Sequence, residues 1–186
     1  QGRIATEKNV EALLKAWKIG KIPSDTCLLI VGDGHLAPSL KPLYGKEHQI
    51  QWFVFIGDEQ RRIDILRAAD VFILPSLVEG LSLSLLEAMS CGVACIATDA
   101  GADGEVLENG AGVVLDTQGV TTQLKSILPL FREHPEITDL LGKKARQRVL
   151  DKYKLRDNIT SVEQLYAEVL REKRVQFHFT SSSIQT

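Results

Sequence analysis

The sequence shows no excess of positive charge. Its 22 lysines and arginines stand against 24 aspartates and glutamates, so the formal net charge is −2 at pH 7. Nucleic-acid-binding domains usually carry a basic surface, because lysines and arginines neutralise the phosphates. The charge balance therefore argues against a nucleic-acid partner.

Cysteines are few, and their spacing matches no familiar metal or disulfide pattern. The three are Cys27, Cys91 and Cys95, an odd number that does not suit a disulfide framework. The histidines share no zinc-ligand spacing with them, so we predict no metal site. Cys27 and Cys95 fall in apolar runs, where cysteine behaves as a small hydrophobe. A reducing, cytoplasmic setting fits this use of cysteine.

Long apolar runs are also missing. None approaches the roughly 20 residues that a helix needs to cross a bilayer, and no secretory signal pattern opens the chain. We therefore predict no membrane span and a cytoplasmic location, which is compatible with peripheral attachment of the full-length protein at the inner membrane face. The chain opens at Gln1 and not at methionine, which we interpret as the mark of a fragment or a processed form.

Short apolar runs instead alternate with amphipathic stretches. The runs are Cys27–Val31, Trp52–Ile56, Val71–Leu74, Val93–Ala97 and Ala111–Leu115. Each is continuous, as in strands of a parallel sheet that is covered on both faces. Between them, apolar residues recur at helical spacing over residues 10–17, 63–69 and 83–89. This alternation predicts an α/β domain with a doubly wound parallel sheet.

The last third of the chain has a different pattern. From about residue 119 the strand pattern stops, and Gln118–Phe131, Glu136–Leu150 and Asn158–Arg171 each resemble a helix. We therefore predict one domain over residues 1–174, with extra C-terminal helices. A poorly ordered tail is expected over residues 175–186.

A glycine-rich turn follows the first predicted strand, at Gly32-Asp33-Gly34. In an open α/β sheet, ligands bind outside the carboxyl ends of the strands. Glycines there let the backbone approach a ligand closely, and a following helix directs free N–H groups at an anion. An ordinary tight turn between a strand and a helix explains the pattern equally well.

Two glutamates follow the third predicted strand, within residues 75–87 (PSLVEGLSLSLLE). Glu79 falls in the predicted loop, and Glu87 falls on the predicted helix after it, so that both can face one cleft. The residues between them would present backbone N–H groups at a helix N-terminus, which suits a phosphate. Taken as an isolated pair, the two glutamates are better explained as solvated surface acids.

Several segments together resemble the signature of retaining GT-B-type glycosyltransferases, and among these family 4, also called group 1. Residues 69–76 (ADVFILPS), Glu79-Gly80 and residues 86–92 (LEAMSCG) resemble its central motif, in which seven residues separate two glutamates. Further segments match in the same order: Gly2-Arg3-Ile4 with Lys8, Ile30–Gly34, and Ala97–Asp99 with Gly101 and Glu105. The resemblance covers roughly residues 2 to 172 and implies the Rossmann-like fold of a GT-B C-terminal domain.

The resemblance implies roles for the residues near the first predicted strand end. Arg3 and Lys8 would neutralise the diphosphate of the sugar donor, a nucleotide diphosphate sugar. Two cations five residues apart suit a pyrophosphate. Gly32 and Gly34 would line the donor cleft.

The two glutamates and the residues between them also acquire roles from the resemblance. Glu79 would contact the transferred sugar, and the Glu87 carboxylate would accept hydrogen bonds from the ribose hydroxyls. Backbone amides would approach the sugar and the phosphates at Gly80, Leu81, Ser82 and Leu83. The catalytic candidates are therefore Glu79, Arg3 and Lys8.

The implied reaction is the transfer of a hexosyl group, with retention, from the nucleotide diphosphate sugar to an acceptor. No cofactor is expected, and GT-B-type enzymes generally work without a metal. The acceptor would bind an N-terminal domain that this chain lacks, so we expect the chain to bind donor without transferring sugar. By comparison with the family, part of the strand before Gly2 is also missing.

One departure from the family pattern keeps an alternative open. The family usually has Glu-Gly-Phe-Gly where this chain has Glu79-Gly80-Leu81-Ser82, and the serine would narrow the space for the sugar. The alternative is a non-catalytic nucleotide-sugar-binding or regulatory module of the same fold. Turnover by the full-length protein would separate the two. A nicotinamide-dependent enzyme is a third hypothesis, but the Gly-x-Gly-x-x-Gly motif is absent.

Overall fold

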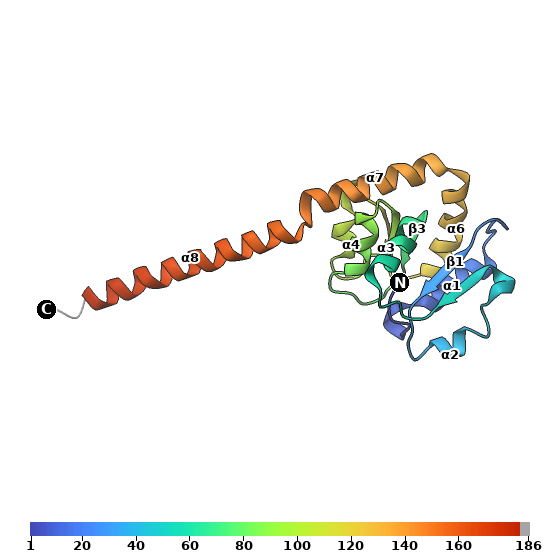
Figure 1. Ribbon diagram of the computed structural model, residues 1–186, viewed down its shortest axis with the longest axis horizontal. Helices are drawn as coiled ribbons and strands as arrows, with labels where there is room; N and C mark the ends of the chain where they lie inside the picture. Colours follow the sequence, from blue (N-terminus) through green and yellow to red (C-terminus); the bar gives the residue numbers. More distant parts are fainter. Residues whose placement is uncertain (183–186) are drawn as a thin grey trace. The chain divides into compact units, whose positions relative to one another are not determined.

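The computed structural model describes residues 1–182 (Figure 1). The chain divides into two compact units, Gln1–Val149 and Leu150–Thr186. Within the first unit, short strands alternate with helices in the order α1, β1, α2, β2, α3, β3, α4, β4, α5, β5, α6. The sequence prediction of an α/β domain is therefore confirmed.

The described strands are β1 (Leu28–Val31), β2 (Ile50–Phe53), β3 (Val71–Leu74), β4 (Ala94–Thr98) and β5 (Val113–Leu115). Every pairing among them is parallel, as predicted. They form two separate sheets, β1-β2 and β3-β4-β5, where the sequence predicted one. The hydrogen-bonded sheet is thus interrupted between β1 and β3.

Apolar runs predicted the strands well but not all of their limits. The predicted strand at Val71–Leu74 is confirmed to the residue, and β4 and β5 differ from their runs by one or two residues. The run Trp52–Ile56 was the least accurate, because β2 ends at Phe53 and the exposed Val54 and Phe55 lie beyond it. Hydrophobicity alone does not fix where strand pairing stops.

Helices of the first unit are α1 (Val10–Ile19), α2 (Ala37–Leu40), α3 (Glu59–Arg67), α4 (Leu83–Ser90), α5 (Asp103–Val106) and α6 (Val120–Glu133), with 3-10 turns η1 (Thr6–Lys8), η2 (Lys46–His48) and η3 (Glu108–Gly110). The α1 helix packs against α6 (Figure 1). One hydrophobic core joins both sheets, since Leu14, Ile30, Ile96 and Leu124 belong to the same buried cluster. Burying such a side chain contributes about 1.5–3 kcal/mol.

The α4 helix begins where Ser82 caps it. The Ser82 Oγ accepts a hydrogen bond from the backbone N–H of Leu85 at 3.3 Å, which satisfies one of the free N–H groups of the first turn. Helical spacing predicted an apolar face that includes Leu83, and this was wrong at that position. Leu83 is 71% exposed, and the helix instead buries Leu85, Ala88 and Met89.

The expectation for the cysteines is confirmed at one position and wrong at another. Cys95 is buried in β4, and burial raises the pKa of its thiol well above the usual range. Cys27 is exposed, because it precedes β1 and lies outside the strand. The apolar run therefore overestimated the burial of its first residue.

Three helices follow β5, as the sequence predicted. They are α6, α7 (Pro135–Lys152) and α8 (Leu155–Ser182). The α8 helix is described as far as Ser182, beyond the predicted domain limit at residue 174, and residues 183–186 lie outside the described part. The domain limit and the order of the tail stay predictions.

Candidate functional site

The glycine turn after β1 lies directly against the start of the chain. The N–H of Gly2 donates to the carbonyl of Val31 at 3.0 Å, and the N–H of Ile4 donates to the carbonyl of Asp33 at 2.9 Å. Gly32 has a φ of 139°, and a Cβ there would collide with the carbonyl of Gly2. Glycine at position 32 is therefore required by a close approach between two backbone segments.

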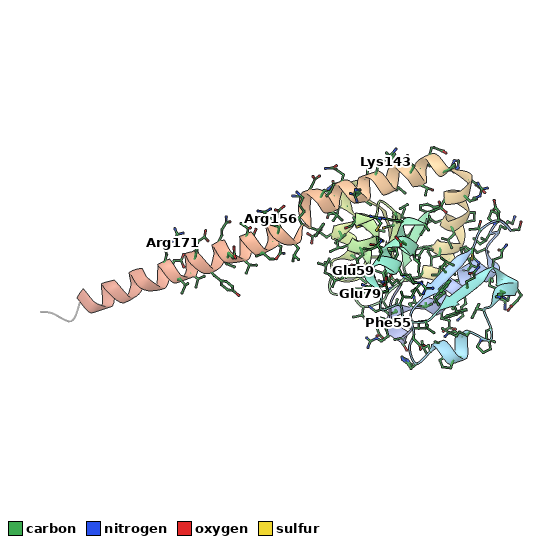
Figure 2. The ribbon with its side chains drawn as sticks, viewed as in Figure 1. Phe55, Glu59, Glu79, Lys143, Arg156 and Arg171 are labelled. Carbon is green, nitrogen blue, oxygen red and sulfur yellow. The ribbon has the colours of Figure 1, made fainter. Side chains whose placement is uncertain are left out.

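The same segment then reaches the loop after β3. Lys8 Nζ donates to Glu79 Oε1 at 2.5 Å, and the Ser76 hydroxyl donates to the same carboxylate oxygen at 2.8 Å. The side chains of Lys8 and Glu79 are 24% and 10% exposed. Figure 2 labels Glu79 in the first unit. The structure thus brings Gly32, Lys8 and Glu79 to one edge, at the carboxyl ends of β1 and β3.

Arg3 is the more exposed of the two predicted cations. Its guanidinium lies 2.7 Å from Glu7 Oε1, and its side chain is 69% exposed. The Glu7 carbonyl in turn accepts from the N–H of Leu77 at 2.8 Å, which ties η1 to the loop after β3. Arg3 is therefore an exposed cation at the rim of the site, while Lys8 is held inside the site by its ion pair with Glu79.

The loop from Glu79 to α4 keeps some of its backbone donors free. The amides of Gly80, Leu81 and Leu83 have no hydrogen-bond acceptor among residues 1–182. The amide of Ser82 is different, because it donates to Asp103 Oδ1 at 3.1 Å. The Ser82 amide, to which the resemblance gave a role in donor binding, is therefore already paired in this structure.

Loop residues after β4 hold this segment in place. The N–H of Ala102 donates to the carbonyl of Gly80 at 2.8 Å. Gly101 has a φ of 61°, and a Cβ there would collide with the carbonyls of Glu79 and Gly80. The hydroxyl of Thr98 donates to the carbonyl of Ser76. Two loops distant in sequence therefore fix the backbone around Glu79.

Asp103 is a buried acid that the sequence analysis did not place in the site. Its side chain is fully buried, and its Oδ2 has no hydrogen-bond partner within residues 1–182. Burial raises the pKa of this carboxyl, and the Glu79 carboxylate adds to the effect, while the Ser82 N–H and Lys8 oppose it. The sequence held one signal for Asp103: this acid lies within a few residues of Thr98 and Gly101, in a segment that resembles the family.

Glu87 is exposed on α4, on the fifth residue of the helix. Unlike Glu79, it is not one of the residues that line the cavity beside the site.

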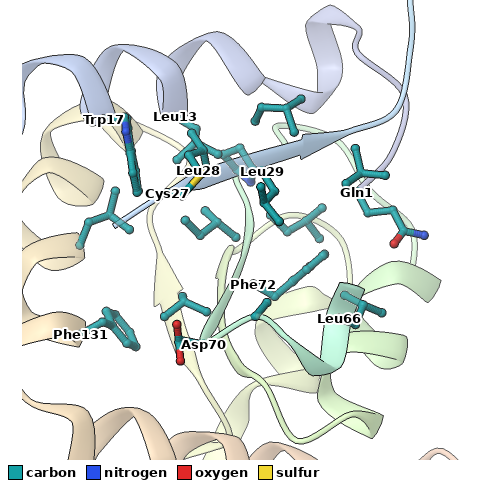
Figure 3. A pocket seen from close by; sticks show the side chains of 18 of the residues that line it. Gln1, Leu13, Trp17, Cys27, Leu28, Leu29, Leu66, Asp70, Phe72 and Phe131 are labelled. Atoms are coloured by element: carbon teal, nitrogen blue, oxygen red, sulfur yellow. The ribbon is translucent and has the colours of Figure 1, made fainter. Parts of the chain in front are cut away.

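A cavity of about 960 Å³ opens beside this group of residues (Figure 3). At the carboxyl ends of the strands it is lined by Gly2, Arg3, Lys8, Ser76 and Glu79. Within residues 1–182, no three histidine, cysteine, aspartate or glutamate side chains gather as a metal site would require. Over the same residues, no helix is long and apolar enough to cross a membrane.

Comparison with known sequences gives the family. The profile of the family described as glycosyl transferases group 1 matches residues 1–148, which is most of the chain. N-acetyl-alpha-D-glucosaminyl L-malate synthase from Bacillus anthracis is 30% identical over 171 residues, covering 90% of this chain and 44% of that protein. UDP-Gal:alpha-D-GlcNAc-diphosphoundecaprenol alpha-1,3-galactosyltransferase from Escherichia coli is 25% identical, covering 92% and 45%. The chain thus spans less than half the length of these relatives.

Solved structures show the same fold. Sucrose-phosphate synthase from Thermosynechococcus elongatus superposes with a TM-score of 0.80 at 23% identity, over 92% of this chain and 44% of that one. The C-terminal domain of a group 1 family glycosyl transferase from Francisella tularensis gives 0.74 at 24% identity and covers 83% and 84%. Anabaena HepE in complex with UDP-glucose gives 0.73 at 22% identity, over 92% and 47%. The fold is that of GT-B glycosyltransferases, and the chain belongs to the glycosyl transferases group 1 family.

Proposed function

We propose that this chain is the donor-binding half of a retaining glycosyltransferase that takes a hexosyl group from a nucleotide diphosphate sugar. The observation that carries the proposal is the Lys8–Glu79 ion pair beside the glycine turn at Gly32. It places a partly buried cation, a carboxylate and a close backbone approach at the carboxyl ends of parallel strands, where ligands bind in α/β folds. Anabaena HepE, which has the same fold, was solved with UDP-glucose.

The main task of this half is electrostatic. When the sugar leaves, negative charge grows on the diphosphate, and preoriented cations and amides stabilise that charge. Arg3, Lys8 and the free amides of Gly80, Leu81 and Leu83 are the groups assigned to this task. The amides lie at the start of α4, where the helix dipole also favours an anion.

Lys8 and Glu79 would exchange partners when the donor binds. Without a donor, the Glu79 carboxylate accepts from both Lys8 and the Ser76 hydroxyl. A diphosphate would compete for the Lys8 ammonium, because a doubly charged phosphate attracts it more strongly than one carboxylate. Glu79 would then be free to accept hydrogen bonds from the sugar hydroxyls.

Ser82 lines the cavity that would hold the donor. Its side chain is 6% exposed, and its hydroxyl accepts from the Leu85 N–H and lies 3.0 Å from the Ser84 hydroxyl. The serine at the position of the family's glycine is therefore engaged in capping α4. Turnover by the full-length protein separates the enzyme from the non-catalytic module.

A thermal-shift screen of nucleoside diphosphates and their sugars tests the proposal and identifies the donor. A ligand at 100 times its Kd stabilises the folded chain by about 2.7 kcal/mol. We expect the diphosphate and the complete donor to raise Tm, and the matching monophosphate to raise it much less. Equal shifts for the monophosphate and the diphosphate would contradict a site built around a pyrophosphate.

Calorimetric titration of two variants separates the roles of the glutamates. Glu87→Ala should weaken the bare diphosphate by roughly 10- to 150-fold, because a charged hydrogen bond contributes about 1.5–3 kcal/mol. Glu79→Ala should not weaken binding of the bare diphosphate, because it removes a competitor for Lys8, and should remove the added affinity of the sugar. Glu133→Ala, which removes another exposed helix acid, should change neither. Equal losses for both ligands in Glu79→Ala would show that Glu79 does not contact the sugar.

A further inference from the structure

Asp103 lies behind the loop that carries the free amides of the site. It is the first residue of α5, and its Oδ1 accepts from the Ser82 N–H at 3.1 Å. Its side chain is 0% exposed, and it is not one of the residues that line the cavity, whereas Ser82 is. Asp103 therefore acts on a ligand in the cavity through Ser82 and not by direct contact.

The hydrogen bond from Ser82 to Asp103 fixes the peptide groups on either side of it. The amides of Leu81 and Leu83, which find no acceptor in the part of the chain that the structure describes, are each one residue away. Their nitrogen atoms lie within about 4 Å of the Ser82 nitrogen. The Ser82 hydroxyl also caps α4 by accepting from Leu85. Rotation of the Ser82 peptide would turn the neighbouring amides away from the cavity, so Asp103 sets their direction.

Backbone contacts hold the segment before Asp103 against the same loop. The N–H of Ala102 donates to the carbonyl of Gly80 at 2.8 Å. Next to it, Gly101 approaches the carbonyls of Glu79 and Gly80 so closely that a Cβ would collide with both. The two loops therefore cannot move independently, and the Asp103 carboxyl keeps a fixed position relative to the amides.

The second carboxyl oxygen of Asp103 shows which charge state suits this position. Oδ2 is buried and has no hydrogen-bond partner within residues 1–182. A buried carboxylate oxygen without a donor is costly, whereas a neutral carboxyl loses much less on burial. Burial accordingly raises the pKa of Asp103, although the Ser82 N–H opposes this shift. Asp103 therefore holds a proton more tightly than a carboxyl in water does.

Charged groups on the neighbouring segments act on Asp103 in opposite directions. After burial, the Glu79 carboxylate in the loop after β3 also raises the pKa of Asp103, and the Lys8 ammonium at η1 lowers it. On its own loop, Asp99 is exposed to solvent. From α7, Arg148 donates to backbone carbonyls of α5. A diphosphate that draws Lys8 away from Glu79 would leave Asp103 facing more negative charge, which favours its protonated form.

We propose that Asp103 is a positioning residue of the donor site, which holds the Ser82 peptide as a neutral acid and opposes anion binding when it ionises. This inference rests on the proposed function, because the anion is the diphosphate of the sugar donor. An ionised Asp103 would lie within about 7 Å of the Leu81 and Leu83 amides and would weaken their attraction for an anion. Asparagine at position 103 would keep an acceptor for Ser82 without the charge.

The test measures the affinity of UDP, and of GDP in parallel, for the unmodified chain and for Asp103→Asn between pH 4 and pH 8. The charge of the nucleotide changes equally in both titrations, so the ratio of the two Kd values isolates Asp103. The Kd of the unmodified chain divided by that of Asp103→Asn should rise from about 1 at pH 4 to at least about 5 at pH 8. Asp64→Asn, which removes an exposed acid of α3, should give a ratio of about 1 throughout. A ratio for Asp103→Asn that stays constant or falls with pH would overturn the proposal.

Amide hydrogen exchange of the ligand-free chain tests the positioning role without any nucleotide. The Ser82 amide should exchange at least about 10-fold faster in Asp103→Leu, which lacks the acceptor, and at an unchanged rate in Asp103→Asn. Asp103→Ala takes the place of the leucine variant if that variant does not fold. Equal protection of the Ser82 amide in all of these proteins would overturn the positioning role. Failure of both nucleotides to bind would contradict the proposed function and not the hold of Asp103 on the Ser82 peptide, which the exchange rates decide.

Discussion

Lys8 Nζ lies 2.5 Å from Glu79 Oε1, although the two residues are 71 positions apart. The contact joins η1 to the loop after β3, and it is better shielded from water than the other lysine–carboxylate pairs of the first unit, such as Lys15–Glu11 with 53% and 51% exposure. Shielding strengthens the attraction and also raises the cost of leaving one partner alone.

Lys8 and Glu79 should be energetically coupled. In a double-mutant cycle of Lys8→Met and Glu79→Gln, we expect a coupling free energy of about 1–2 kcal/mol. The matched cycle on Lys15 and Glu11, an exposed pair one helical turn apart, should give a clearly smaller coupling. Urea unfolding of the unmodified chain, the four single variants and the two double variants measures both. Equal coupling in the two cycles would mean that the burial of the Lys8–Glu79 pair has no energetic effect.

Gly101 and Gly80 should respond differently to alanine. A Cβ on Gly101 would meet two carbonyls at a positive φ, whereas a Cβ on Gly80 would meet no atom within 4 Å. We expect Gly101→Ala to cost about 2 kcal/mol or more in unfolding free energy and Gly80→Ala to cost less than about 0.5 kcal/mol. Chemical denaturation checks both values. A stable Gly101→Ala protein would show that the two loops can separate freely.

The stability of the chain should depend on pH through Asp103. Its pKa is raised in the folded state above the ordinary value of 3.8, chiefly by burial. The folded protein therefore holds this proton more tightly than the unfolded chain, and its unfolding free energy falls as pH rises from about 3.8 through the raised pKa. In Asp103→Asn this loss is absent, while an oxygen remains to accept from the Ser82 N–H.

Urea titrations of both proteins between pH 4 and pH 8 measure the effect. The stability of Asp103→Asn relative to the unmodified chain should increase with pH and then level off. Asp103→Leu, which removes the acceptor for Ser82 as well, should be less stable than Asp103→Asn across the range. If the difference in unfolding free energy between the unmodified chain and Asp103→Asn stays constant with pH, Asp103 does not titrate between pH 4 and pH 8.

Arg3 should act on ligand affinity without acting on stability. Its side chain is 69% exposed and pairs with Glu7 at the surface, so Arg3→Gln should leave Tm within about 1 °C. The affinity for a nucleoside diphosphate should fall at low salt, and the loss should shrink at high salt because the interaction is screened. Lys125→Gln, on the exposed face of α6, is the control and should change neither quantity.

The chain alone should bind donor but transfer no sugar. It spans less than half the length of its curated relatives, and in GT-B architecture the acceptor binds the other half. Filtration of the chain with radiolabelled donor should show binding, and a second mixture with added acceptors should yield no labelled product. Sustained transfer by the purified chain would contradict this division of tasks.

Local sequence patterns were sufficient for the elements and the motifs. Continuous apolar runs predicted every described strand, because a strand that is covered on both faces needs apolar side chains on both of them. The spacing of Glu79 and Glu87 and the order of the matching segments predicted the family. The sequence patterns did not predict where β2 ends or which face of α4 is buried. The end of a strand depends on its pairing partner, and the start of a helix depends on its cap, which for α4 is Ser82.

Contacts between distant residues required the tertiary structure. The Lys8–Glu79 pair, the Ser82–Asp103 hydrogen bond and the backbone contact of Gly101 with Glu79 join loops that lie far apart in the chain. No periodicity or motif encodes them, because each depends on which strand ends meet at one edge. The sequence determined which residues bear the chemistry, and only the packing of the two sheets decided which of them touch.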